Sequence, residues 1–194
     1  MIVNESGSLT ETGIVVLTVL AFPVAALTVP VLAVLRRVLG VAWPRAWRHS
    51  LAEVAIVYGT VPGLLLTMVP GSEAGLVSGA VSLEPFTDMP TMGRIGIIGN
   101  LILLAALGFF APIRFRGLRS VWRVLGLALA VSVSIEVLQY ALVLDRVSSV
   151  DDVILNAGGA TAAAIVSWPW WRRRRPRPGV SDQRRGDLVE AGSA

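Results

Sequence analysis

Five long apolar stretches constrain the fold of this chain more than any other feature of its sequence. Each is long enough to cross a hydrocarbon core about 30 Å thick as an α-helix that rises about 1.5 Å per residue. Hydrophobic residues make up 54% of the 194 residues and charged residues only 15%, too little polar surface for a water-soluble domain of this length. The sequence therefore predicts an all-α, multi-pass bundle in the cell membrane, with about five spans at 14–39, 51–69, 95–111, 121–144 and 153–168.

The arginines predict how these helices are oriented. All 17 basic residues are arginine, and all but Arg94 and Arg146 lie around the connection of the first two spans, around the connection of the third and fourth spans, or after the fifth. The positive-inside rule then places the N-terminus outside and the C-terminus in the cytoplasm. All six tryptophans fall at the arginine-rich ends of the spans, as interfacial anchors do.

The two ends of the chain are polar. Residues 1–13 are acidic and lack arginine, which does not match the positively charged start of a signal peptide, so we expect no cleavage. Residues 172–194 are rich in Arg, Pro and Gly, and we expect a disordered cytoplasmic tail. Its arginines either act only as a stop-transfer cluster or also touch anionic lipid headgroups. The membrane domain then spans residues 1–171.

Several familiar kinds of chemistry have no residues to support them. The chain has no cysteine, and its one histidine, His49, has no partners for a zinc site. Neither a Walker A loop nor a GxSxG elbow is present. The arginines are dispersed around apolar spans, which does not favour nucleic-acid binding. We expect no metal, no cofactor and no nucleic-acid partner, whereas membrane lipids are expected partners.

Polar residues that are costly in a membrane gather within 134–159. Glu136 and Gln139 lie near the outer end of the fourth span, with Glu136 about 12 Å below its edge. Asp152 and Asn156 are one turn apart and share a face of the fifth span. Arg146 lies in the loop that joins the two spans.

The third span brings further polar groups to the same depth. Asn100 lies about 8 Å below the outer end of this span, and Arg94 caps that end. An ionisable side chain inside a membrane costs about 3 kcal/mol, so it normally faces the protein interior or a water-filled cavity. The sequence therefore predicts an outward-facing polar pocket in which Glu136 accepts a proton or pairs with a cation, and Arg146 or Arg94 contacts an anion.

A purely structural interpretation of the same residues is also open. Glu136 would then be protonated, or hydrogen-bonded to Asn100 and Asn156, and would hold helices together. Asp151 and Asp152 are candidate N-terminal caps of the fifth span, where carboxylates favour the helix dipole. We expect one of them to be the cap, and Asp152, which is in line with Asn156, to face the pocket.

Two further segments bear on this pocket. The outer loop 70–94 contains the sequence VSLEPF at 81–86 and is either a solvated connection or a re-entrant segment that covers the site. Gly159 lies in a stretch of small residues and would let the fifth span approach the fourth closely.

Several short motifs occur in order along the chain. The segment has Glu136 and Gln139 as ExxQ, then Arg146, then SVDDVILNAGG at 149–159. Upstream lie GNLILLAALGFF at 99–110, with Asn100 and Gly108, and the VSLEPF segment. This pattern resembles the VanZ-like family of small bacterial membrane proteins over roughly 81–166. Ser82 and Ala106 depart from it, because the family often has Asn and Pro there.

The resemblance implies a function at the cell envelope. It suggests resistance to teicoplanin-type glycopeptide antibiotics, as for the family's founding member, and a structural role for Gly108 and Gly159. A lipid headgroup, a lipid-linked wall precursor or a lipophilic glycopeptide would suit an outward-facing pocket. If the site carries out a reaction, Glu136 or Asp152 is the candidate general base. The alternatives are a proton-coupled transporter or flippase, and a helix-packing scaffold whose polar cluster is structural.

Overall fold

The structure, a computed structural model, describes residues 10–71, 74–75 and 80–172. Five helical segments of this part are long and apolar enough to cross a membrane, so the predicted all-α bundle of about five spans is confirmed. The expectations for residues 1–9 and for the tail beyond Arg172 lie outside the described residues. The elements are α1 (Glu11–Val38), α2 (Trp43–Thr67), β1 (Val81–Ser82), α3 (Met89–Leu103), α4 (Ala105–Arg114), the 3₁₀ turn η1 (Arg116–Leu118), α5 (Val121–Ala141), β2 (Ser148–Ser149) and α6 (Val150–Trp171).

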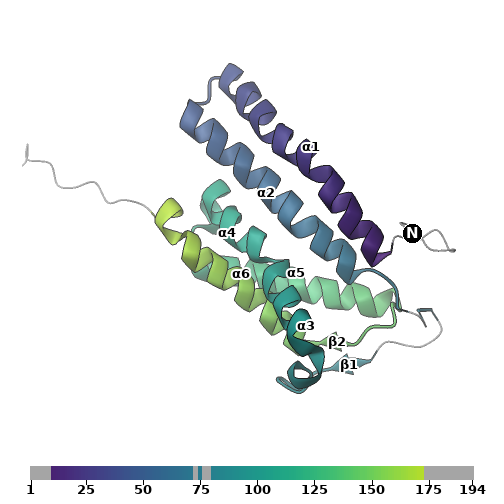
Figure 1. The fold of residues 1–194 in the computed structure, drawn as a ribbon. Helices are drawn as coiled ribbons and strands as arrows, with labels where there is room; N and C mark the ends of the chain where they lie inside the picture. The colour runs from purple at the N-terminus through teal and green to yellow at the C-terminus, as the bar shows by residue number, and fades with distance from the viewer. Residues whose placement is uncertain (1–9, 72–73, 76–79, 173–194) are drawn as a thin grey trace, which may run out of the picture.

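Helices α3, α4 and α5 pack around α6 (Figure 1). Helix α2 packs on α4, and α1 packs mainly on α2 at the edge of the bundle. Most large apolar side chains of α1 are exposed, as expected for a helix that faces lipid. The Arg36 side chain donates to Ser50 and Glu53 of α2, and Arg114 of α4 donates to the same Glu53, so these three helices are joined by charged groups.

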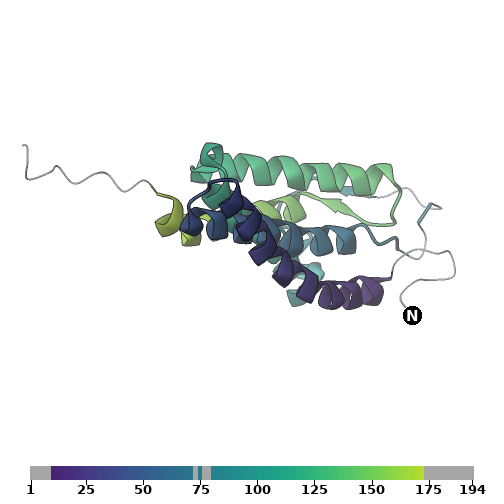
Figure 2. The same ribbon diagram turned by 90° about the horizontal axis from the view of Figure 1, so that it is seen from above.

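The bundle has two ends, which lie at opposite sides of the molecule in Figures 1 and 2 and differ in sequence composition. We call one end the loop end; it contains the start of α1, the segment 80–88 and the segment 142–149. We call the opposite end the basic end; it contains the turns 39–42 and 115–120 and the end of α6. The arginine distribution predicts that the basic end faces the cytoplasm.

The third span is broken, unlike the single helix predicted over 95–111. It begins earlier, at Met89, and Gly93 interrupts the helix with a φ of 70° that favours glycine. A second break at Leu104 separates α3 from α4. On either side of this break the backbone lies close to that of α6. A Cβ at Gly108 of α4 would overlap the carbonyl of Ala160, and a Cβ at Gly159 of α6 would overlap the carbonyl of Leu101 in α3.

Two expectations about the last spans need correction. Gly159 lets α6 approach the third span, not the fourth, because its closest neighbour is Leu101 of α3. Helix α5 ends at Ala141 and not at residue 144, since the chain turns there to bring β2 alongside Glu136. Glu136 is therefore about 8 Å from the end of its helix, rather than about 12 Å.

The segment 80–89 lies against the bundle rather than extending freely into solvent. β1 pairs in parallel with β2, and the backbone N–H of Ser148 also donates to the carbonyl of Ala80. This pairing joins residues that are 67 positions apart in the chain, so the outer loop reaches the start of α6.

Candidate functional site

A polar cavity of about 190 Å³ lies near the loop end of the bundle. It is formed by α2, α3, α5, α6 and the loop before β2, and apolar Leu103 and Ile135 also line it. The structure brings six of the seven residues proposed for binding or catalysis into its wall. These six are Asn100, Glu136, Gln139, Arg146, Asp152 and Asn156.

Of the two carboxylates in this wall, Glu136 is the more buried. Its side chain is only 8% exposed and accepts a hydrogen bond of 3.0 Å from the backbone N–H of Ser149. Its carbonyl accepts another from the Ser148 hydroxyl, also at 3.0 Å. The expected structural partners Asn100 and Asn156 donate elsewhere, to Asp152 and to Ser132. Glu136 is thus fixed by β2 and directed along the cavity wall.

The amide side chains of the site are oriented by specific acceptors. Gln139 donates to the backbone carbonyl of Thr67 at the end of α2, at 2.8 Å. Asn100 donates to the carboxylate of Asp152, which ties α3 to α6. Asn156 donates to the Ser132 hydroxyl at 2.9 Å, while its own Oδ1 is buried without a partner among the described residues. A buried acceptor of this kind in a cavity wall is available to a donor that enters the cavity.

Arg146 supplies the positive charge at the mouth of the cavity. Its Nε donates to the carbonyl of Val69 at 3.2 Å, and its terminal nitrogen lies 3.7 Å from the carboxylate of Glu11. The side chain remains about one third exposed, so an incoming anion would reach it. Arg94, in contrast, is exposed on α3 and does not line this cavity.

The two neighbouring aspartates have different environments. Asp152 lines the cavity, in line with Asn156 as the helical spacing implies. Asp151 is fully buried and accepts the backbone N–H groups of Phe86, Asp88 and Met89, at 2.6, 2.9 and 3.1 Å. It was expected to be a cap of its own helix, but the Ser149 hydroxyl accepts from the backbone N–H of Asp151 there. Asp151 instead holds the start of α3.

Some residues around the site were not recognised from sequence. Thr67 provides the carbonyl that orients Gln139, and Asp88 accepts a hydrogen bond of 2.6 Å from the Ser149 hydroxyl. This hydroxyl, followed by a weaker contribution from that of Ser82, lowers the pKa of Asp88 below its ordinary value. Asp88 stands two residues after the VSLEPF segment, in the outer loop, and no sequence motif marks it as a partner of Ser149.

An apolar groove of about 290 Å³ adjoins the polar cavity. The linings of the two share one residue, Glu136. The apolar lining comes from β1 and the segment after it, from α5 and from α6. It includes Val81, Leu83, Val133, Val137, Tyr140 and Val153.

Comparisons with known proteins bear on the family of this chain. The family model described as VanZ/LLP1 matches residues 56–172, which is more than half of the chain and includes every residue of the cavity. No curated protein and no solved structure matched. The extent of the family match shows that this membrane protein belongs to the VanZ/LLP1 family.

Proposed function

We propose that this protein binds an amphiphilic molecule of the cell envelope at the loop end of the bundle, and that this binding contributes to glycopeptide resistance. The polar group of the ligand enters the cavity of about 190 Å³, and its apolar part lies in the adjoining groove of about 290 Å³. The observation that carries the proposal is that Glu136 lines both, because a polar cavity beside an apolar groove matches a molecule with both characters.

The cavity residues have distinct roles in this proposal. Glu136 and Asp152 accept hydrogen bonds from hydroxyl or amino groups of the ligand, and the free Oδ1 of Asn156 accepts another. Arg146 contacts a phosphate or carboxylate at the mouth, for which a guanidinium fork is well suited. A lipid headgroup, a lipid-linked wall precursor and a lipophilic glycopeptide each combine such groups with an apolar part. If a reaction follows binding, Glu136 or Asp152 acts as the general base.

Transport is a weaker proposal for this site. Toward the basic end, the cavity wall continues through Leu103 and Ile135 into a buried hydrophobic cluster that also contains Leu104, Ala128, Ala157 and Ala160. A charged or strongly polar group would lose its hydrogen bonds in crossing this cluster, at a cost of several kcal/mol. Uptake of a substrate by proteoliposomes that disappears in Glu136→Gln would reverse this ranking.

Growth of a glycopeptide-susceptible bacterium that expresses the full chain tests the link to resistance. The wild-type chain is expected to raise the teicoplanin concentration that inhibits growth, and Glu136→Gln and Arg146→Gln are expected to remove this effect at equal membrane abundance. Glu84→Gln is the matched control, since Glu84 is an exposed acid of the same end of the bundle. Unchanged resistance in both cavity variants would overturn the proposal.

Direct binding is measured by native mass spectrometry of the full chain in detergent with three probes, phosphatidylglycerol, undecaprenyl phosphate and teicoplanin. We expect retention of at least one probe, and retention at least tenfold weaker in Glu136→Gln, because one hydrogen bond to a charged group contributes about 1.5–3 kcal/mol. Equal retention by wild type and variant, with a lower thermal stability of the variant, would instead show that the polar cluster is structural.

A further inference from the structure

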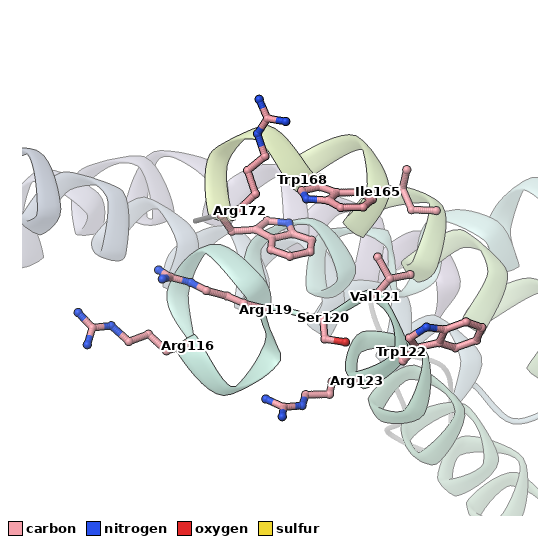
Figure 3. A pocket seen from close by; sticks show the side chains of 10 residues that line it. Arg116, Arg119, Ser120, Val121, Trp122, Arg123, Ile165, Trp168 and Arg172 are labelled. Carbon is pink, nitrogen blue, oxygen red and sulfur yellow. The ribbon is translucent and has the colours of Figure 1, made fainter. Parts of the chain in front are cut away.

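A second cavity lined by charged residues lies at the basic end, away from the polar site. Its volume is about 740 Å³, and it opens between η1, the start of α5 and the end of α6 (Figure 3). Helix α5 has 21 residues, so this hollow and the polar cavity are separated by most of a helix length of about 30 Å. The two sites use different residues and can be tested separately.

Four arginines and no acidic residue line this hollow. In Figure 3 the guanidinium groups of Arg116, Arg119 and Arg123 extend to the same side, whereas that of Arg172, at the end of α6, extends in a different direction. Arg123 donates to the carbonyl of Gly117 at 2.8 Å and Arg119 to that of Pro112 at 3.3 Å, which positions their guanidinium groups.

Backbone donors add to this positive surface. Ser120 is the N-cap of α5 and lines the hollow, but its side chain makes no capping hydrogen bond. The first backbone N–H groups of α5 therefore lack the side-chain acceptor that often satisfies them, and a helix N-terminus with arginines beside it attracts anions. The hollow combines this helix terminus with the guanidinium groups of Arg116, Arg119 and Arg123, a stronger anion site than either feature alone.

The remaining wall is aromatic and apolar. The rings of Trp168 and Trp171 are stacked, with an interplanar angle of 8° and centroids 5.9 Å apart. Trp171 is 6% exposed and its indole N–H donates to the Ser167 hydroxyl at 2.9 Å, so it supports the more exposed Trp168. Trp122 is 79% exposed at the opposite side of the opening. Tryptophans of this kind lie at the level of lipid headgroups in membranes.

We propose that this hollow is a binding site for one anionic phospholipid of the leaflet that contacts the basic end. The phosphate lies among the guanidinium groups of Arg116, Arg119 and Arg123 and faces the start of α5. The glycerol and the first methylene groups lie on Trp168 and Ile165. A soluble phosphate would use the charges alone, whereas a phospholipid also covers the exposed indole surface, so the combined lining favours the lipid.

Competition for the site in nanodiscs tests this proposal. The full chain is placed in phosphatidylcholine nanodiscs with a minor share of phosphatidylglycerol, and bound lipid is measured by native mass spectrometry after mild release. We expect wild type to retain phosphatidylglycerol in preference to phosphatidylcholine. Arg116→Gln/Arg123→Gln is expected to lower this preference about 25-fold, or about fivefold for each arginine, as expected for basic side chains at an anionic surface.

Matched variants separate charge from fold. Arg37→Gln/Arg45→Gln removes two exposed arginines at the same end but outside the hollow, and should leave the preference unchanged. Arg116→Lys/Arg123→Lys keeps the charges and should restore most of it. Trp168→Ala should weaken retention of phosphatidylglycerol without changing binding of inorganic phosphate. Equal loss in the Arg37/Arg45 control, or displacement of the lipid by millimolar inorganic phosphate, would overturn the proposal.

Discussion

At position 159 a side chain would overlap the carbonyl group of Leu101, whereas at position 158 it would meet no neighbouring group within 4 Å. Gly158 and Gly159 are adjacent on α6 and cannot be distinguished by composition. Because α3 approaches α6 at Leu101 through its backbone, which cannot rotate away as a flexible side chain does, the lack of a Cβ matters at only one of the two positions.

Gly159→Ala should therefore destabilise the protein by about 1–3 kcal/mol, the usual cost of an extra group in a packed contact. Gly158→Ala should be neutral or stabilising by up to about 1 kcal/mol, since alanine is the better helix former. Thermal unfolding of both variants in the same detergent measures the difference. Equal melting temperatures would contradict the close contact between α3 and α6.

Asp151 provides a second prediction at the scale of one residue. Its buried carboxylate accepts three backbone N–H groups from 86–89. Asp151→Asn replaces one oxygen by an amide that faces these donors, and loss of a charged hydrogen bond costs about 1.5–3 kcal/mol. Faster hydrogen exchange at Phe86, Asp88 and Met89 is expected, with no change in Glu84→Gln. Unaltered protection in Asp151→Asn would show that other contacts hold the loop.

At the scale of elements, the segment 80–89 is the connection that completes the polar end. Its strand β1 pairs with β2, and its backbone N–H at Phe86 donates a hydrogen bond to the Asp151 carboxylate. The carboxylate of Asp88 accepts a hydrogen bond from the Ser149 hydroxyl. The backbone N–H of Ser149 meanwhile donates to Glu136. One short strand pair therefore links the outer loop to the carboxylate shared by the cavity and the groove.

This connection should depend on pH in a defined direction. The pKa of Asp88 is lowered below its ordinary value of 3.8, chiefly by the Ser149 hydroxyl. A lowered pKa means that the contact stabilises the fold fully above pH 3.8, and that this contribution is lost as the pH falls through the pKa of the folded state. Carbon-13 NMR titration should give a lower midpoint for Asp88 in wild type than in Ser149→Ala. Identical midpoints would exclude this hydroxyl as the cause.

At the scale of the whole molecule, the two ends differ in charge and in tryptophan content. The chain has no cysteine, so single cysteines report topology without background labelling. We expect Glu84→Cys in intact cells to react with a membrane-impermeant maleimide, and Arg45→Cys to react only after the cells are opened. The positive-inside rule is the reason for this expectation. The reverse labelling pattern would place the polar cavity on the cytoplasmic side.

Much of the bundle follows from local sequence. An apolar stretch of about 20 residues has few alternatives to a membrane helix, because the bilayer cannot satisfy backbone N–H and C=O groups. Helical spacing likewise places Asp152 in line with Asn156, and both line the cavity. The positions at which the third span breaks were not predictable in this way. No proline marks Leu104. The break lies between two close backbone contacts with α6, one between Leu101 and Gly159 and the other between Gly108 and Ala160.

The class of fold, the number of spans and the set of polar residues could be predicted before folding, since hydrophobicity and helical period are properties of neighbouring residues. Which of these residues meet became clear only from the three-dimensional arrangement of the helices. It excluded Arg94 from the cavity, gave Asp151 a role at the start of α3, and placed an apolar groove beside Glu136. The physical reason is that these outcomes depend on contacts between segments far apart in the chain, such as β1 with β2, which no local pattern encodes.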